Sequence, residues 1–112
     1  MADRNPPPLT PAGYQVLLAL ASGHAHGYAV MRFIADATGG SVQLGPGTLY
    51  RTIARLAADG LVEEADGDAR RRNYRLTASG RAAARRESAL LARLAALAAE
   101  AGLLPDEGRQ SA

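Results

Sequence analysis

The segment from Gly45 to Gly60 constrains the fold of this chain more than any other. Pro46 follows directly after a glycine, and proline is well tolerated at the first position of a helix. The segment ends at Asp59-Gly60, where glycine commonly closes a helix in the left-handed conformation. These two signals predict a helix of about 13 residues between them.

The predicted helix has two chemically different faces. At about 100° per residue, Leu49, Ile53 and Leu56 fall on one side, as expected for a helix that packs on a core. The opposite side is polar over an arc of about 100° and carries Thr48, Arg51, Thr52 and Arg55. One face therefore belongs to the interior, and the other presents hydroxyl and guanidinium groups.

Two further helices are predicted ahead of this one. Thr10-Pro11 supplies an N-cap and a first-turn proline for a helix over residues 11–21, which ends at Ser22-Gly23. The next helix covers residues 27–38 and stops at Gly39-Gly40. The spacing of apolar residues predicts the core faces, with Tyr14, Leu17, Leu18 and Ala21 on the first helix and Tyr28, Met31, Ile34 and Ala35 on the second.

Short strands are predicted on both sides of the Gly45–Gly60 helix. Residues 41–44 alternate polar and apolar side chains, which is typical of an edge strand that pairs with a later segment. Residues 61–65 and 70–76 flank Asp66-Gly67-Asp68, and Asp-Gly between two strands predicts a hairpin. This hairpin carries four arginines, namely Arg70, Arg71, Arg72 and Arg75.

A long alanine-rich helix is predicted to follow the hairpin, from an N-cap at Thr77 to Gly102. Its apolar seam, with spacings of four and three, consists of Leu90, Leu94, Leu97, Ala101 and Leu104, widened by Leu91 and Leu103. The other predicted helices already share a core, so we expect this seam to pair with a second copy through Leu90, Leu91, Leu94, Leu97 and Ala101. The alternative is a helix that folds back on its own domain.

These elements predict a mainly α fold with a small β-hairpin, namely a winged helix-turn-helix domain followed by a long C-terminal helix. With 112 residues, the chain is expected to form one small domain. The expected organisation is a disordered arm over residues 1–8, the winged-helix domain over 9–77, a dimerisation helix over 78–104 and a disordered tail over 105–112.

Several classes of function are excluded or disfavoured by composition. The chain has no cysteine, which excludes disulfides and thiolate metal sites. His24 and His26 stand two apart, with no third metal ligand near in sequence, and no catalytic constellation or phosphate loop is present, so we expect no metal, no cofactor and no enzyme activity. The longest apolar run, residues 16–21, is too short to span a membrane, and we expect a cytoplasmic protein.

Six motifs occur in the order found in one family of bacterial transcriptional regulators. They are Leu9-Thr10-Pro11, His26-Gly27-Tyr28, Thr38-Gly39-Gly40 with Val42 and Leu44, Leu44-Gly45-Pro46-Gly47-Thr48-Leu49-Tyr50-Arg51, Asp59-Gly60-Leu61-Val62, and Arg71-Arg72-Asn73-Tyr74-Arg75-Leu76-Thr77. In these motifs, roughly over residues 9–86, the chain resembles the PadR family. The departures are small, since Asn73 stands where an aromatic residue is common and the chain has no tryptophan.

The resemblance implies a homodimeric repressor of the short form, with a single C-terminal helix that makes the dimer. The charge distribution agrees with a DNA partner, because residues 45–86 hold nine arginines against five acidic residues. We predict that double-stranded DNA is contacted by Thr48, Tyr50, Arg51, Thr52, Arg55, Arg70 and Arg72.

The sequence leaves three pairs of alternatives open. Tyr50 is either a phosphate donor or an aromatic residue packed under the helix. The hairpin arginines either face DNA or form ion pairs with Glu63, Glu64 and Asp66. The domain itself either binds DNA specifically or serves as a protein-interaction module that keeps only the shape of the fold.

The resemblance also implies a small phenolic, aromatic or drug-like effector near the dimer interface. The candidate aromatic contacts for such an effector are Phe33 and Tyr14. A short-form regulator that senses no ligand is the alternative.

Overall fold

A computed structural model describes residues 8–66 and 72–105. The elements are α1 (Pro11–Ala21), α2 (Gly27–Ala37), α3 (Pro46–Ala58), β1 (Val62–Ala65), β2 (Asn73–Leu76) and α4 (Ala78–Glu100). The two strands pair antiparallel, with Val62 opposite Leu76 and Glu63 opposite Arg75. The predicted fold class, mainly helical with one small hairpin and a long last helix, is confirmed.

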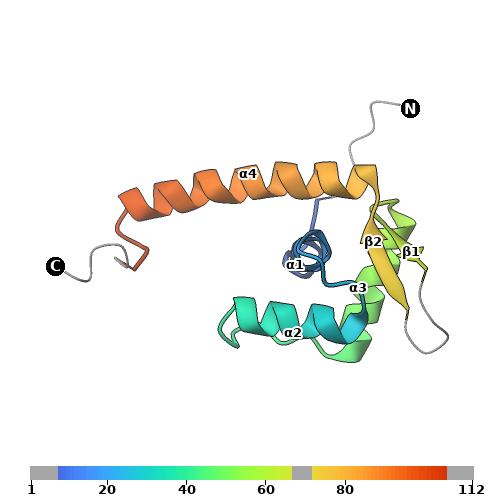
Figure 1. Ribbon diagram of the computed structural model, residues 1–112. Coiled ribbons are helices and arrows are strands. Elements are labelled where there is room, and N and C mark those ends of the chain that lie inside the picture. Colours follow the sequence, from blue (N-terminus) through green and yellow to red (C-terminus); the bar gives the residue numbers. More distant parts are fainter. Residues whose placement is uncertain (1–7, 67–71, 106–112) are drawn as a thin grey trace.

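Helix α1 occupies the centre of the domain. It contacts α2, α3, α4 and β2, and Figure 1 shows it between α4 on one side and α2 on the other. The hairpin lies near the start of α4, while the far half of α4 extends past α1. The core is therefore built around α1, and α4 is part of it only at its N-terminal end.

The core consists of side chains from every helix and from the hairpin. Those from α1, α2 and α3 that are almost completely buried are Val16, Leu17, Val30, Ile34 and Leu49. Ile53 and Leu56 extend the buried face of α3, as predicted, and Tyr74 closes the core from β2. Burial of these apolar groups is the main term that stabilises the fold.

The predicted starts of α1 and α4 are confirmed by their caps. The Thr10 hydroxyl accepts a hydrogen bond from the Gly13 backbone N–H at 2.9 Å. The Thr77 hydroxyl does the same for the N–H of Gly80, also at 2.9 Å. Each bond satisfies an amide that has no partner within its own helix.

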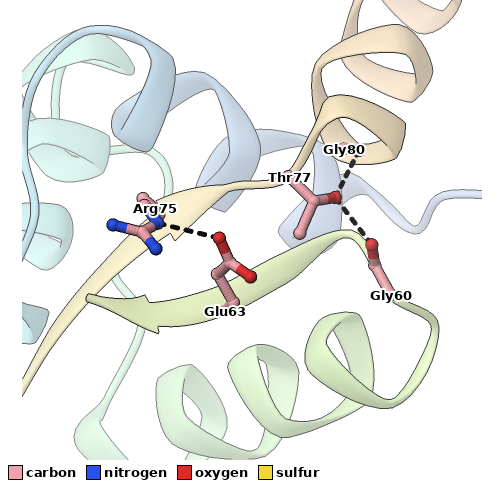
Figure 2. A network of polar contacts seen from close by, with 5 residues as sticks. All are labelled: Gly60, Glu63, Arg75, Thr77 and Gly80. Atoms are coloured by element: carbon pink, nitrogen blue, oxygen red, sulfur yellow. Dashed lines mark hydrogen bonds and ion pairs between the residues drawn. The ribbon is translucent and has the colours of Figure 1, made fainter.

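Thr77 also joins α4 to the turn that follows α3. Its hydroxyl donates to the Gly60 carbonyl at 2.6 Å while it caps α4, so one side chain bridges two backbone segments (Figure 2). Gly80 packs directly on the Leu61 backbone, where a Cβ would collide with the Leu61 carbonyl. The first turn of α4 is thereby held against the end of α3 and the start of β1.

The strand predicted over residues 41–44 does not form. The Val42 N–H donates instead to the Thr38 hydroxyl at 3.0 Å, while Val42 and Leu44 pack their side chains on the core. The segment that lies beside β2 comes from the α1–α2 loop, because the Tyr74 N–H donates to the Ala25 carbonyl at 2.8 Å. An isolated bridge between His26 and Asn73 continues this pairing.

The predicted core faces of α1 and α2 are rotated from the real ones. On α1, Leu17 is buried, but Leu18 and Ala21 are exposed, and Val16 and Ala19 are buried in their place. On α2, Ile34 is buried and Met31 packs on the core, as predicted, but Tyr28 is 62% exposed, and Gly27 and Val30 complete the buried line. Apolar residues occur on several sides of both helices, and their packing against neighbouring elements selects the buried side.

Helix α4 leaves the core about halfway along its length. Gly80, Ala83 and Ala84 are buried, whereas the leucines further along the helix are exposed. Gly102, with φ of 78°, follows the end of the helix, close to the predicted stop. In the single chain, therefore, the second half of α4 has no core beneath it among the described residues.

Candidate nucleic-acid interface

The polar face of α3 is accessible, as predicted. Thr48, Arg51 and Arg55 are exposed and Thr52 is half-buried, while Leu49, Ile53 and Leu56 hold the opposite face in the core. The Thr52 hydroxyl donates to the Thr48 carbonyl at 2.8 Å, which fixes its rotamer against the helix. The structure thus places four of the predicted residues on one continuous surface.

The two arginines of α3 are available for an anionic partner. Arg51 donates a long hydrogen bond of 3.4 Å to the Thr48 hydroxyl, one turn earlier. Neither Arg51 nor Arg55 forms an ion pair within residues 8–66 and 72–105. A guanidinium group that forms no ion pair can bind a guanine edge or a phosphate without first breaking one.

Tyr50 was predicted to be either a phosphate donor or an aromatic residue packed under the helix, and its surroundings are intermediate between an exposed and a buried side chain. Its side chain is 46% exposed, yet its hydroxyl lies against the α-carbon of Gly27 at the start of α2. A Cβ on Gly27 would come within 2.8 Å of the Tyr50 Cζ atom. Tyr50 is therefore neither a core residue nor a free side chain, and its phenol packs α3 onto α2.

The hairpin arginines that the structure describes are paired with acids. Arg75 Nε donates to Glu63 Oε2 at 2.8 Å (Figure 2), and Arg72 Nη1 lies 3.5 Å from Glu64 Oε2. The hydrogen bond from Arg75 to Glu63 raises the pKa of the Arg75 guanidinium. The ion-pair alternative from the sequence is confirmed for Glu63 and Glu64, and this weakens the assignment of Arg72 to DNA.

Most of the remaining part of the predicted hairpin lies outside the described residues. Arg70 lies outside the described residues, as do Arg71 and the predicted turn at Gly67-Asp68. Asp66 is held through its backbone, since its carbonyl accepts from Asn73 Nδ2 at 3.0 Å. Among the arginines assigned to DNA, Arg51 and Arg55 on α3 are the ones that form no ion pair in the described part of the chain.

The stripe predicted for dimerisation is exposed on α4. The exposed fractions of its leucines rise from 40% at Leu91 to 59% at Leu97, and Leu90, Leu94 and Ala101 are exposed as well. Tyr14 of α1 marks the point where α4 leaves the core, because its hydroxyl shares a hydrogen bond of 2.7 Å with that of Ser88. The first half of α4 therefore packs on its own domain, as in the alternative predicted from the sequence, and the second half does not.

The two aromatic residues proposed for an effector lie in different surroundings. Phe33 lines a hollow of about 490 Å³ on α2 together with His24, Tyr28 and Arg32, whereas Tyr14 bonds to α4. The His24 and Phe33 rings lie 4.8 Å apart. The Tyr28 hydroxyl accepts from Arg32 at 3.3 Å, and this bond raises the pKa of Arg32.

Among the described residues no group of three or more histidine and acidic side chains is placed to hold a metal ion. His26 occupies the N-cap position of α2 and bridges to Asn73. None of the helices within the described ranges combines the length and the apolar character needed to span a membrane.

Three helices around a central α1, a two-stranded wing and an exposed arginine face on α3 define a winged-helix transcription regulator. Residues 16–86 match the Transcriptional regulator PadR-like family, and the chain belongs to this family. The matched domain is accordingly that of a DNA-binding regulator and not of an enzyme. This assignment favours DNA binding over the protein-interaction alternative.

Comparison with known proteins supports the same fold. A transcriptional regulator from Clostridium thermocellum has a TM-score of 0.68 and 23% sequence identity, covering 80% of this chain and 87% of that chain. The PcaV transcriptional regulator from Streptomyces coelicolor, in complex with its natural ligand, has a TM-score of 0.65 and 25% identity, covering 89% of this chain and 66% of that chain.

A relative in sequence is an uncharacterized 37.1 kDa protein in transposon TN4556 of Streptomyces fradiae. It is 42% identical over 92 residues, which make up 82% of this chain. The match spans 26% of the relative's own length. The likeness therefore concerns the regulator domain and a minor part of that larger protein.

Proposed function

We propose that this chain is a homodimeric repressor that acts in the cytoplasm, binds an inverted-repeat operator in double-stranded DNA and is released by a small hydrophobic ligand. The observation that carries the proposal is the presence of two unoccupied surfaces in one chain. One is the arginine face of α3, and the other is the leucine stripe of α4. The first fits DNA, and the second fits another copy of α4.

The DNA-binding part of the proposal assigns different contacts to different residues of α3 and the wing. Thr48 and Arg51 lie in its first half, which is the part that reaches base edges when a recognition helix enters the major groove. An arginine there can donate two hydrogen bonds to guanine. Tyr50, which packs on Gly27 but is 46% exposed, would donate its hydroxyl to a phosphate. Arg72 and Arg70 would contact the DNA backbone from the wing, where Arg72 must exchange Glu64 for phosphate.

The dimerisation part of the proposal rests on the exposed leucines of α4. Leu90, Leu94 and Leu97 recur at spacings of four and three on a helix that is exposed along this stretch. Exposed leucines in this pattern are typical of a helix that pairs with another helix. Two copies related by a two-fold axis would present two α3 helices to a near-palindromic site. A dimer seated on a promoter would exclude polymerase, which is the basis for proposing repression.

The ligand part of the proposal concerns a hollow on α2. The solved PcaV regulator is in complex with its natural ligand, and its identity to this chain is 25%. In this chain Phe33, Tyr28 and His24 offer aromatic faces to the hollow on α2. An apolar or aromatic ligand seated there would contact the helix that precedes α3. Release of DNA by such a ligand, and loss of that response in a Phe33→Ala variant, would support this part.

The experiment that tests the proposal is selection of DNA from a random duplex library by the purified protein. We expect enrichment of an inverted repeat whose half-site centres are about 34 Å apart, or a multiple of that distance. The enriched duplex should bind at least about a thousandfold more tightly than a random duplex of equal length. Recovery of no enriched sequence, or of single half-sites, would contradict the proposal of a dimeric, sequence-specific regulator.

A further inference from the structure

A second hollow, of about 220 Å³, lies where α3 meets the segment that leads into α1. Its walls are formed by Pro8, Leu9, Thr10 and Gly13 on one side and by Arg51, Thr52, Arg55, Leu56 and Asp59 on the other. Three of the residues assigned to DNA on α3 therefore border the same hollow as the start of α1. The site assignment made from the sequence did not include any residue ahead of α3.

The groups around this hollow favour an anion. Two arginines and one aspartate line it, which gives it a net positive charge. Arg55 forms no hydrogen bond or ion pair with any part of the chain that the structure describes, and no ion pair of Asp59 is found there either. A phosphate group can accept N–H donors from a guanidinium group in the geometry that this side chain prefers.

Thr10 adds a neutral donor on the opposite wall. Its oxygen accepts the Gly13 N–H at 2.9 Å, and the hydroxyl hydrogen stays available to donate to an anion. The segment is fixed in place because Leu9, next to Thr10, packs on the core. The hollow thus has guanidinium donors on one wall and a positioned hydroxyl on the other.

We propose that this hollow binds one backbone phosphate of DNA, held by Arg55 and by the Thr10 hydroxyl. The proposal rests on the proposed binding of DNA by α3, and it adds residues 8–10 as a contact element beside α3 and the wing. A helix in the major groove has phosphate backbones along both sides. Arg55 is accordingly a phosphate contact that positions α3, while base reading falls to Thr48 and Arg51.

The test compares Thr10→Asp with Thr10→Asn. Aspartate and asparagine are both good N-caps, so α1 is preserved in both variants, and the two side chains have nearly the same shape. They differ in one negative charge beside the hollow. We expect Thr10→Asp to bind a random-sequence duplex at low salt at least about tenfold more weakly than Thr10→Asn, because a carboxylate would face the phosphate. In an Arg55→Gln background this difference should shrink, because the phosphate has lost its main anchor.

A matched pair on α4 controls for the change in total charge. Ala92 is exposed and lies on the side of α4 opposite the leucine stripe, so Ala92→Asp and Ala92→Asn should differ by less than about twofold. Equal DNA affinities for the two Thr10 variants, with both folded by circular dichroism, would overturn the phosphate site alone. Absence of binding to any duplex by the wild-type protein would instead overturn the proposed function.

Discussion

The hydroxyl groups of Tyr14 and Ser88 lie 2.7 Å apart, and this hydrogen bond joins α1 to α4 across 74 positions of sequence. It lies one turn beyond Ala84, the last residue of α4 in the core, and just ahead of the exposed leucines. Because α1 contacts all the other helices, the bond links the direction of α4 to the centre of the domain.

Removal of this hydrogen bond should cost measurable stability. Tyr14→Phe leaves the ring in place and deprives half-buried Ser88 of its partner, so we expect the free energy of unfolding to fall by about 0.5–1.5 kcal/mol. Urea unfolding followed by circular dichroism measures this change. Tyr28→Phe is the matched control, since that hydroxyl is exposed and bonds to Arg32 at 3.3 Å, and it should leave stability nearly unchanged. Equal effects of the two substitutions would show that the Tyr14 bond contributes nothing specific.

The contact between Gly27 and Tyr50 should make an alanine at position 27 destabilising. The added methyl group would overlap the Tyr50 phenol, and we expect a loss of about 1–3 kcal/mol in unfolding free energy. Gly47→Ala provides the control, because its Cβ would meet no atom within 4 Å and alanine favours the α3 helix. The combined variant Gly27→Ala with Tyr50→Phe should recover part of the loss; no recovery would mean that the cost arises elsewhere.

Arg51→Ala should impair sequence recognition. We expect specific binding to weaken by about 1–3 kcal/mol, with relaxed base preference at one position in each half-site. Competition binding with single-base variants of the selected duplex measures both effects. A loss of equal size on every sequence, including random DNA, would make Arg51 a phosphate contact instead.

The ion pair between Arg72 and Glu64 predicts opposite effects for its two partners. Glu64→Gln releases Arg72 and removes a negative charge, so binding to random and specific duplexes should tighten by about two- to fivefold at low salt. Arg72→Ala should weaken binding to both and flatten the dependence on salt. Glu100→Gln, exposed at the far end of α4, controls for the charge change and should have a smaller effect. If Glu64→Gln and Glu100→Gln behave alike, the wing does not approach DNA.

Leu94→Asp should separate the dimer. A carboxylate in the middle of the stripe cannot be buried against another α4 without a large desolvation cost. We expect monomers in analytical ultracentrifugation and loss of binding to the inverted repeat, with the fold of the domain retained. Ala92→Asp, on the opposite side of the same helix, should remain dimeric. Survival of the Leu94→Asp dimer would show that the stripe is not the interface.

The ends of the helices and the two faces of α3 could be predicted from sequence because local chemistry determines them. Thr10 and Thr77 cap their helices with their own side chains, and Gly102 follows the end of α4 with a positive φ. Leu49, Ile53 and Leu56 are the large aliphatic residues of α3 and share one face, so their burial could be predicted. Periodicity is a strong signal where large apolar residues occupy one face alone.

The predictions that were wrong concern features that depend on contacts between elements far apart in the sequence. Residues 41–44 alternate like a strand, but the place beside β2 is taken by Ala25, which no local pattern indicates. On α1 and α2 apolar residues occur on several sides, and contacts with the neighbouring elements select which side is buried. For the site, the sequence indicated Arg51 and Arg55 but could not distinguish Arg72 in an ion pair from Arg72 facing DNA. The contact of Tyr50 with Gly27 also depends on how α3 crosses α2.

The small residues at the start of α4 have a consequence for operator architecture. Gly80, Ala83 and Ala84 let the helix lie close to the domain, and its rigid second half continues without a break. In a dimer joined through that half, the length of α4 would set the distance between the two winged-helix domains and thus between their α3 helices. Each residue inserted ahead of the leucines would lengthen the helix by about 1.5 Å and rotate the attached domain by about 100°. The length of this helix would therefore set which spacings of half-sites the regulator accepts, independently of the bases that α3 reads.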